Sequence, residues 1–165
     1  MTERCQRKKM RLDGYDYARC GVYFITICTN ERKPLFWADV GAICDRPPTA
    51  PKLSPLGEIV KAEMLRLDET YEEVQVENYC IMPNHVHFLL LIQPDADGRT
   101  QFAPTISRAM KQFKGAATKK AGFPLWQKSF HDHIVRSQES YLDIWQYIDE
   151  NPLKWQLDSL CKWEE

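Results

Sequence analysis

Residues 85–92 are the feature that most restricts how this chain can fold. Their sequence, His-Val-His-Phe-Leu-Leu-Leu-Ile, is apolar at nearly every position and has the length of a β-strand. A strand that lacks a polar face has to be covered on both faces by other elements. Pro83-Asn84, a dipeptide typical of tight turns, separates this segment from a second strand-like segment, residues 74–82. The pattern therefore predicts an antiparallel hairpin whose second strand is buried on both faces.

The other periodic segments complete a fold prediction. Residues 22–29 are β-branched and aromatic, and 129–136 form a further strand-like segment. Helices are predicted at 56–67 and 105–120, where apolar residues recur with a helical period, and at 140–150. The resulting order, β-α-β-β-α-β followed by a helix, is that of the ferredoxin-like or split βαβ fold. We therefore predict an α+β protein with a ferredoxin-like antiparallel sheet and an additional C-terminal helix.

The length of 165 residues corresponds to one domain with an arm. We predict a basic N-terminal arm at 1–19 and a single domain at 20–165. Four prolines between positions 44 and 55 predict a loop or insertion there. The net charge of -1 excludes a protein that binds nucleic acid through a large overall positive charge. The basic residues are nevertheless clustered, in the arm and around 111–128, and such clusters either contact phosphate or form solvated faces.

The chain shows no signal for a membrane or for secretion. Its longest apolar run is far shorter than the roughly 18–20 residues that a membrane helix needs, and its N-terminus lacks the apolar stretch of a secretory signal. We therefore expect a cytoplasmic protein without a membrane partner. Its six cysteines include no pair with C-x-x-C spacing, so we expect them to be reduced and assign them no chemistry.

Two histidine pairs are candidates for a metal site. Alternate residues of a strand point to one face, so His85 and His87 can hold one ion between them. His131 and His133 repeat this spacing on the predicted fourth strand. The alternative for either pair is that these are ordinary strand histidines with satisfied hydrogen bonds. Two histidines alone make a poor site, so we expect a third ligand elsewhere in the chain.

The last predicted helix offers two candidate residues. Tyr147 and Asn151 are four positions apart and therefore lie on one side of a helix, at the edge of its apolar stripe. Taken singly, each has a simpler structural interpretation. Tyr147 would be an aromatic residue at the rim of the core, and Asn151 would be the N-cap of a turn that begins at Pro152.

Taken together, these motifs resemble a known family. A histidine-hydrophobic-histidine strand in a ferredoxin-like order, followed by a helix with Tyr-x-x-x-Asn-Pro, is similar to the HUH single-tyrosine transposases and especially to their REP-associated branch. The resemblance covers roughly residues 21–155. It rests on four segments: Gly21–Thr26, Ile81–His87, Trp126–His133 and Tyr147–Pro152.

The resemblance implies a chemistry for these residues. It implies that His85 and His87 bind a divalent metal, that Asn151 completes the metal site and that Tyr147 is the nucleophile. The expected activity is nicking and rejoining of DNA through a covalent 5′-phosphotyrosine intermediate, with Mg²⁺ or Mn²⁺ as the cofactor. The alternatives are a non-catalytic nucleic-acid-binding module of the same fold and a small metal-dependent hydrolase that does not act on DNA.

Single-stranded or hairpin DNA is the partner that this chemistry implies, because a duplex does not expose a free strand to a small cleft. Relatives of this kind lead us to expect either a monomer or a homodimer. Basic side chains are expected to meet the phosphates and an aromatic side chain to stack on a base. The residues expected to do so are Arg7, Lys8, Lys9, Lys111, Lys114, Trp126 and Arg136.

Overall fold

The computed structural model describes residues 20–38, 51–94 and 106–161, and all structural statements below concern these residues. Seven helices and strands follow one another in the predicted order, and two short 3₁₀ helices accompany them. The elements are β1 (Gly21–Cys28), the 3₁₀ helix η1 (Asn30–Arg32), α1 (Pro55–Thr70), β2 (Val74–Ile81), β3 (His85–Ile92), α2 (Ile106–Ala121), β4 (His131–Val135), α3 (Gln138–Glu150) and the 3₁₀ helix η3 (Asn151–Leu157).

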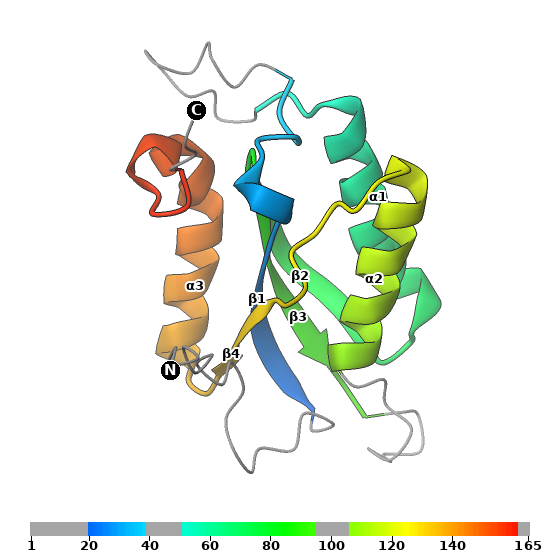
Figure 1. Ribbon diagram of the computed structural model, residues 1–165. Helices are drawn as coiled ribbons and strands as arrows, with labels where there is room; N and C mark the ends of the chain where they lie inside the picture. Colours follow the sequence, from blue (N-terminus) through cyan, green and yellow to red (C-terminus); the bar gives the residue numbers. More distant parts are fainter. Residues whose placement is uncertain (1–19, 39–50, 95–105, 162–165) are drawn as a thin grey trace, which may run out of the picture.

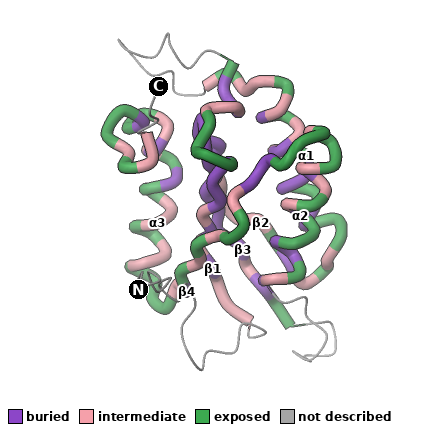
Figure 2. The backbone as a smooth tube through the Cα atoms, viewed as in Figure 1, coloured by how far each residue is buried: buried purple, intermediate pink, exposed green. Residues whose placement is uncertain are grey.

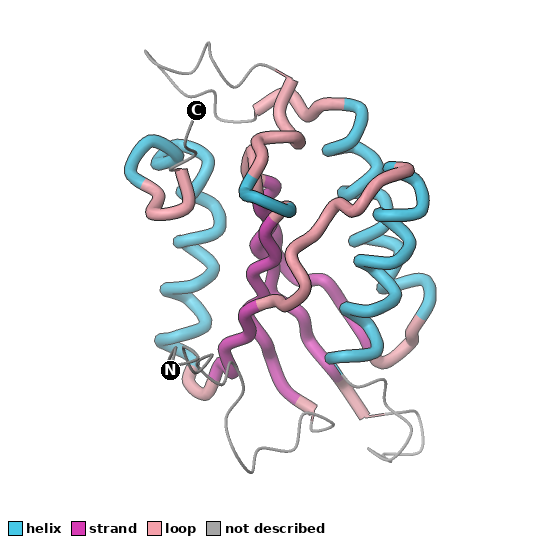
Figure 3. The backbone as a smooth tube through the Cα atoms, viewed as in Figure 1, coloured by secondary structure: helices cyan, strands magenta, loops and turns pink. Residues whose placement is uncertain are grey.

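The strands form one antiparallel sheet in the order β2-β3-β1-β4. Helices α1 and α2 cover one face of the sheet and α3 covers the other (Figures 1 and 3). Adjacent residues of β3 demonstrate the two faces, because Phe88 packs against Phe113 of α2 while His87 packs against Tyr147 of α3. The ferredoxin-like α+β prediction with an additional C-terminal helix is therefore confirmed.

Strand β3 is buried along almost its whole length, as its apolar sequence predicts (Figure 2). On the α1 and α2 side, its neighbours are fully buried apolar side chains such as Tyr23 and Ile25 of β1. The α3 side is different, because two of the residues that β3 presents there are His85 and His87. Polar groups are thus buried on one face of the central hairpin only.

Local contacts fix where two of the helices begin. The hydroxyl of Ser54 accepts a hydrogen bond from the Gly57 amide at the start of α1, and Ser137 accepts one from Ser140 at the start of α3. Gly57 is required by close packing, because a Cβ at this position would collide with the carbonyl oxygen of Phe36. These caps define the first turns of both helices.

Several sequence predictions concern segments beyond the described residues. The predicted arm at 1–19 lies outside them, as do residues 44–50 of the predicted loop, and the division into arm and domain remains a prediction. The described cysteines are free, and Cys28 and Cys80 are buried in strands. Among the described residues, none of the helices combines the length and the apolar character that crossing a bilayer requires.

Candidate active site

His85 and His87 project from β3 toward α3 and lie side by side. Their ring centroids are 4.5 Å apart, and their exposed fractions are 0% and 3%. In the antiparallel ladder, His85 is opposite Cys28 of β1 and His87 is opposite Thr26. The shared face that the H-x-H spacing predicts is confirmed.

Each ring has a hydrogen-bond partner at Nδ1. The Nδ1 atom of His85 is 2.8 Å from Asn84 Oδ1, and that of His87 is 2.8 Å from the hydroxyl of Thr26. An amide oxygen can only accept, so Nδ1 of His85 carries the proton and Nε2 keeps its lone pair. Metal-binding histidines are commonly held in this way through the ring nitrogen that faces away from the ion.

Burial keeps both imidazoles neutral. It lowers the pKa of His87 to about 3 and lowers the pKa of His85 well below its usual value. The positive charges of His87, when protonated, and of Arg32 lower the pKa of His85 further. Both rings are therefore in the neutral form that binds metals at physiological pH, with no proton to displace from a cationic ring.

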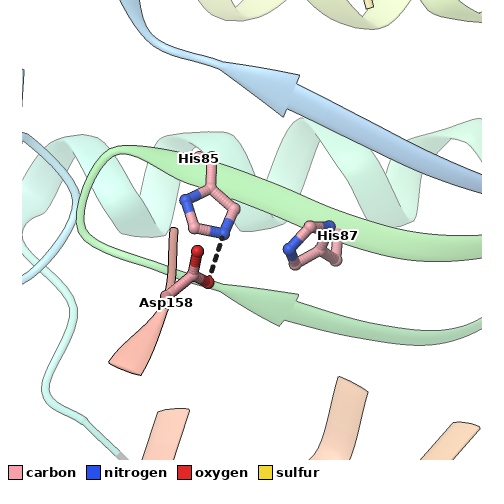
Figure 4. A group of neighbouring side chains, drawn as sticks. All are labelled: His85, His87 and Asp158. Atoms are coloured by element: carbon pink, nitrogen blue, oxygen red, sulfur yellow. Dashed lines mark ion pairs between the residues drawn. The ribbon is translucent and has the colours of Figure 1, made fainter. Parts of the chain in front are cut away.

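A carboxylate that the sequence analysis missed completes this group. Asp158 directly follows η3, and its Oδ2 lies 3.5 Å from Nε2 of His85 (Figure 4). One ligand atom each from His85, His87 and Asp158 lie within 4.8 Å of one another. The buried indole of Trp155 holds η3 in place by packing near Trp37 and His85.

The unsatisfied atoms of this group indicate what can bind there. His85 Nε2 and Asp158 Oδ2 are both buried, and neither makes a hydrogen bond within the described part of the chain. With His85 neutral, two acceptors face each other, which is unfavourable unless a cation lies between them. Two imidazole nitrogens and a carboxylate oxygen are a ligand set that suits a divalent transition metal. The residues therefore fit the divalent ion expected from the sequence.

Tyr147 stands beside this group. Its hydroxyl is 3.4 Å from Nε2 of His87, and its ring packs edge-on against Phe24. The side chain is 46% exposed, so a substrate can reach it. Burial and the charge of Asp158 raise its pKa, while the neighbouring amide of Asn151 acts in the opposite direction. Tyr147 is therefore a protonated phenol at neutral pH, at the border between the polar group and solvent.

Asn151 is buried and its backbone is helical, with φ -57° and ψ -43°. The chain thus passes from α3 into η3 without a break, and no side chain caps η3. An N-cap has non-helical backbone angles, so the interpretation of Asn151 as the N-cap of the turn that follows is wrong. Its Nδ2 atom is buried and makes no hydrogen bond of ordinary geometry among the described residues. The same side chain lies close enough to Tyr147 to act on the pKa of its phenol, and its role as a metal ligand stays a prediction.

A pocket opens next to Tyr147. It has a volume of about 340 Å³ and is lined by residues of α3, η3 and the turn after η3, including Asn151, Leu157 and Asp158. The side chain of Leu157 is 85% exposed at this place. Tyr147 and Asp158 therefore both line a space that is accessible to a ligand.

The second histidine pair lies on the same face of the sheet but outside this group. His131 and His133 are exposed on β4, where His131 is opposite Thr26 of β1, the residue that is also opposite His87. Strand β1 therefore separates the two pairs, and two strand spacings amount to about 10 Å.

The lysines predicted to meet DNA lie on the opposite side of the sheet. Lys111 is exposed on α2, the helix that packs on the face away from α3. Lys114 is only partly exposed, and its ammonium group donates hydrogen bonds to the carbonyl oxygens of Gln127 and Lys128. Lys114 thus fastens the segment before β4 to α2.

The remaining predicted DNA contacts are scattered. Trp126 is 8% exposed and packs between Phe36 and Phe113, at centroid distances of 5.4 and 5.5 Å, so it offers no open ring face to a base. Arg136 is exposed directly after β4, where it lines a pocket of about 320 Å³. The basic residues Arg7, Lys8 and Lys9 lie outside the described residues.

With this geometry established, comparison with known proteins identifies the family. Residues 58–151, more than half of the chain, match the family described as "Transposase IS200 like". The chain belongs to the IS200-like transposase family. The matched range contains both histidines of β3 and both candidate residues of the last helix. The resemblance inferred from the motifs is confirmed.

Two relatives come from Haemophilus influenzae. An uncharacterized protein of that organism is 32% identical, and the alignment covers 93% of this chain and 92% of the relative. A second protein, named "Putative REP-associated tyrosine transposase", is 24% identical over 84% of this chain and 74% of its own length. A solved structure of a REP-associated tyrosine transposase bound to a REP hairpin has a TM-score of 0.58, with 19% identity, and covers 87% of this chain and 74% of that one. This last similarity shows a shared fold.

Proposed function

We propose that this IS200-like transposase cuts and rejoins single-stranded DNA, including strands folded into hairpins, through a covalent bond between Tyr147 and a 5′ phosphate. The observation that carries the proposal is the 3.4 Å approach of the Tyr147 hydroxyl to Nε2 of His87. It brings a nucleophile that solvent can reach to the edge of a buried group of metal-binding atoms. Fold similarity to a REP-associated tyrosine transposase that was solved bound to a REP hairpin supports hairpin DNA as the substrate class.

A divalent ion, Mg²⁺ or Mn²⁺, would be held by His85, His87 and Asp158, with Asn151 Oδ1 as the further predicted ligand. When bound, such an ion polarises a phosphoryl oxygen and offsets the charge that develops in the transition state. The histidines contribute neutral nitrogen donors, and Asp158 contributes a negative charge. Mn²⁺ suits the nitrogen ligands better than Mg²⁺ does.

The proposed cleavage step is a transesterification. The Tyr147 oxygen attacks the scissile phosphorus, so a tyrosine–phosphate bond forms while the bond from phosphorus to the 3′ oxygen breaks. The phenol loses one proton, and the departing 3′ oxygen gains one. In the joining step a 3′-hydroxyl attacks the phosphotyrosine and restores the phenol. The number of phosphoester bonds is unchanged, so neither step needs ATP.

The negative charge of Asp158 affects how easily Tyr147 loses its proton in this step. Asp158 is the second cause, after burial, of the raised pKa of Tyr147. Neutralising the carboxylate removes this cause and makes the phenolate easier to form. In the free protein the residue therefore rests as an unreactive phenol, which protects it from side reactions.

Arg136 is the described basic residue that we propose as a phosphate contact near α3, because Ser140 of that helix lines the same pocket. It follows β4 directly and is exposed, and its pocket also contains His133. The pocket beside Tyr147 would receive the strand next to the scissile phosphate. Lys111 lies on the far side of the sheet and would contact only a part of the DNA that extends around the molecule. A monomer and a homodimer are both compatible with this proposal.

The experiment that tests the proposal is adduct formation with a labelled single-stranded hairpin in the presence of Mn²⁺. We expect a protein–DNA adduct that survives denaturation, and we expect Tyr147→Phe to abolish it while hairpin binding remains. Tyr141→Phe is the matched control, since Tyr141 is on the same helix. An adduct of unchanged yield in Tyr147→Phe would remove Tyr147 from the mechanism. Hairpin binding without any adduct in the wild-type protein would favour the non-catalytic binding module.

A further inference from the structure

Asn84, in the turn between β2 and β3, connects three separate parts of the chain. It is 1% exposed, and its side chain contacts His85 Nδ1, the carbonyl oxygen of Arg32 and the carbonyl oxygen of Leu160. We propose that Asn84 is a positioning residue. It fixes His85 in its metal-binding form and ties the turn that carries Asp158 to that histidine. The inference rests on the proposed function in taking His85 and Asp158 as ligands.

The two carbonyl contacts determine which way the Asn84 amide points. Its Nδ2 lies 3.1 Å from the oxygen of Arg32 and 2.8 Å from the oxygen of Leu160, and both oxygens can only accept. The NH₂ end must therefore face them, which leaves the oxygen end facing His85 Nδ1 at 2.8 Å. The proton of His85 is thereby held at Nδ1, and Nε2 is left as a lone pair toward Asp158.

The contact with Leu160 acts on the carboxylate in turn. The backbone amide of Leu160 donates to Asp158 Oδ1 at 2.7 Å, which closes a small turn between these two residues. Oδ1 is thus occupied, and Oδ2 is the oxygen that faces His85 Nε2 at 3.5 Å. Asn84 therefore positions both atoms of the 3.5 Å contact. It acts on Asp158 Oδ2 through Leu160 and on His85 Nε2 through the hydrogen bond at Nδ1.

The backbone of the turn is held independently of the Asn84 side chain. The carbonyl oxygen of Asn84 accepts hydrogen bonds from the amide and the hydroxyl of Thr29, and the amide of Met82 donates to the carbonyl oxygen of His85. A side-chain substitution at position 84 therefore leaves the contacts that form the hairpin. This separates a positioning role from a role in building the fold.

The first test compares the metal-free wild-type protein with Asn84→Ala. Nitrogen NMR of the imidazoles is expected to show the Nδ1–H tautomer of His85 in the wild type. In the variant we expect the proton to move to Nε2, where it can be donated to Asp158 Oδ2. Calorimetry should then show Mn²⁺ affinity lowered by roughly 10- to 100-fold, the usual cost of losing a residue that orients a metal ligand. A wild-type tautomer with wild-type affinity would overturn the proposal.

A second variant distinguishes the contact with His85 from the contact with Leu160. It also tests the proposal if Asn84→Ala does not fold. Asn84→Asp keeps an oxygen toward His85 but replaces the NH₂ donor, so the Nδ1–H tautomer should remain. Loss of the contact with Leu160 should speed hydrogen exchange at the Leu160 amide by at least tenfold. Unchanged exchange there would contradict the link to Asp158.

Asn78→Ala is the matched control, because the side chain of Asn78, on β2, also bridges to a later part of the chain, through Asp149 of α3, but it does not touch a histidine. It should leave both the tautomer and the Mn²⁺ affinity unchanged, and a change equal to that of Asn84→Ala would overturn the assignment. The tautomer is read in metal-free protein without DNA. A failed cleavage assay therefore counts against the proposed function alone, whereas an unaltered tautomer counts against Asn84.

Discussion

The two H-x-H motifs of this chain have the same spacing and very different surroundings. His85 and His87 lie on β3, which is paired on both edges, and they are almost completely buried. His131 and His133 lie on β4, at the edge of the described sheet, and are exposed. Both pairs point to the face that α3 covers. Spacing therefore sets the direction of a side chain, but its position in the sheet decides whether water surrounds it.

Burial changes what the first pair can do. It lowers the pKa values of His85 and His87, which keeps the imidazoles neutral. The Nδ1–H group of His85 donates to Asn84 Oδ1, and Nδ1 of His87 is hydrogen-bonded to the Thr26 hydroxyl, so both rings are held in place. An exposed histidine keeps its water shell and its rotamer freedom, so it gains less from binding an ion. The two pairs therefore differ in burial and in the hydrogen bonds that orient the rings, and only the buried pair combines the H-x-H spacing with both.

The largest expected effect tests this comparison directly. His85→Ala and His87→Ala should each lower metal-dependent cleavage by at least about 100-fold, because losing a ligand costs more than losing a residue that orients one. His131→Ala and His133→Ala should stay within about threefold of wild type. Cleavage rates and calorimetric Mn²⁺ binding measure both. The reverse pattern would mean that the exposed pair is the metal site.

Asn151 is the next position at which the buried site can be probed. Asn151→Ser is too short to reach an ion held by the histidines, so cleavage at limiting Mn²⁺ should fall by roughly tenfold or more, in line with the loss of a supporting metal contact. Asn151→Asp should tighten Mn²⁺ binding and lower the stability of the metal-free protein, because it adds a second carboxylate near Asp158. Thermal melts with and without Mn²⁺ separate the two effects. Wild-type cleavage in Asn151→Ser would exclude Asn151 as a ligand.

The pH dependence of the free energy of unfolding tests the burial of His87 without any substrate. Below its ordinary pKa of 6.5, His87 binds a proton in the unfolded chain, whereas the folded chain resists protonation down to about pH 3. The unfolded state therefore holds more protons, and the free energy of unfolding should fall as pH drops from 6.5 toward 3, by up to about 1.4 kcal/mol per pH unit for one histidine. Urea titrations of metal-free protein measure this slope.

The same titrations contain their own control. His87→Ala should make the pH slope shallower, because it removes the imidazole whose pKa burial lowers. A slope that did not respond to His87→Ala would show that this imidazole is protonated in the folded protein. In that case burial would not be what distinguishes the first pair.

The smallest expected effects concern the opposite face of the sheet. Lys111→Glu should weaken binding of all single-stranded sequences by about two- to threefold and flatten its salt dependence, because phosphate contacts carry no sequence information. Lys114→Glu should in addition lower the free energy of unfolding by about 1 kcal/mol, since it removes hydrogen bonds to two loop carbonyl groups. Binding at several salt concentrations and thermal melts measure these changes. Unchanged binding in Lys111→Glu would mean that DNA does not reach this face.

Sequence patterns predicted the parts of the molecule that depend on local periodicity. The apolar run of residues 85–92 and the turn at Pro83-Asn84 specified the hairpin, and alternation along the strand brought His85 and His87 together. The contrast between the histidine pairs was also partly visible, because residues 85–92 are apolar at nearly every position whereas residues 129–136 contain several polar positions.

What could not be predicted depends on contacts between distant segments. Asp158 reaches His85 only because η3 turns back and Trp155 anchors it, and no spacing rule joins these residues. The only signal was an acidic residue shortly after the helix that carries Tyr147. Trp126 has an aromatic ring of the kind that stacks on bases, but its packing against Phe36 and Phe113 makes it part of the core.

The attachment of α3 to the sheet has a consequence for how the site moves. Only Ile148 of this helix is fully buried, whereas the strand with the two histidines is hydrogen-bonded on both edges. Segments with few buried apolar contacts open at a lower free energy than the core does. Amide protons of α3 should therefore exchange with solvent much faster than those of β3. The helix that carries the tyrosine is therefore expected to open at a lower free energy than the strand that carries the histidines, while the sheet stays intact.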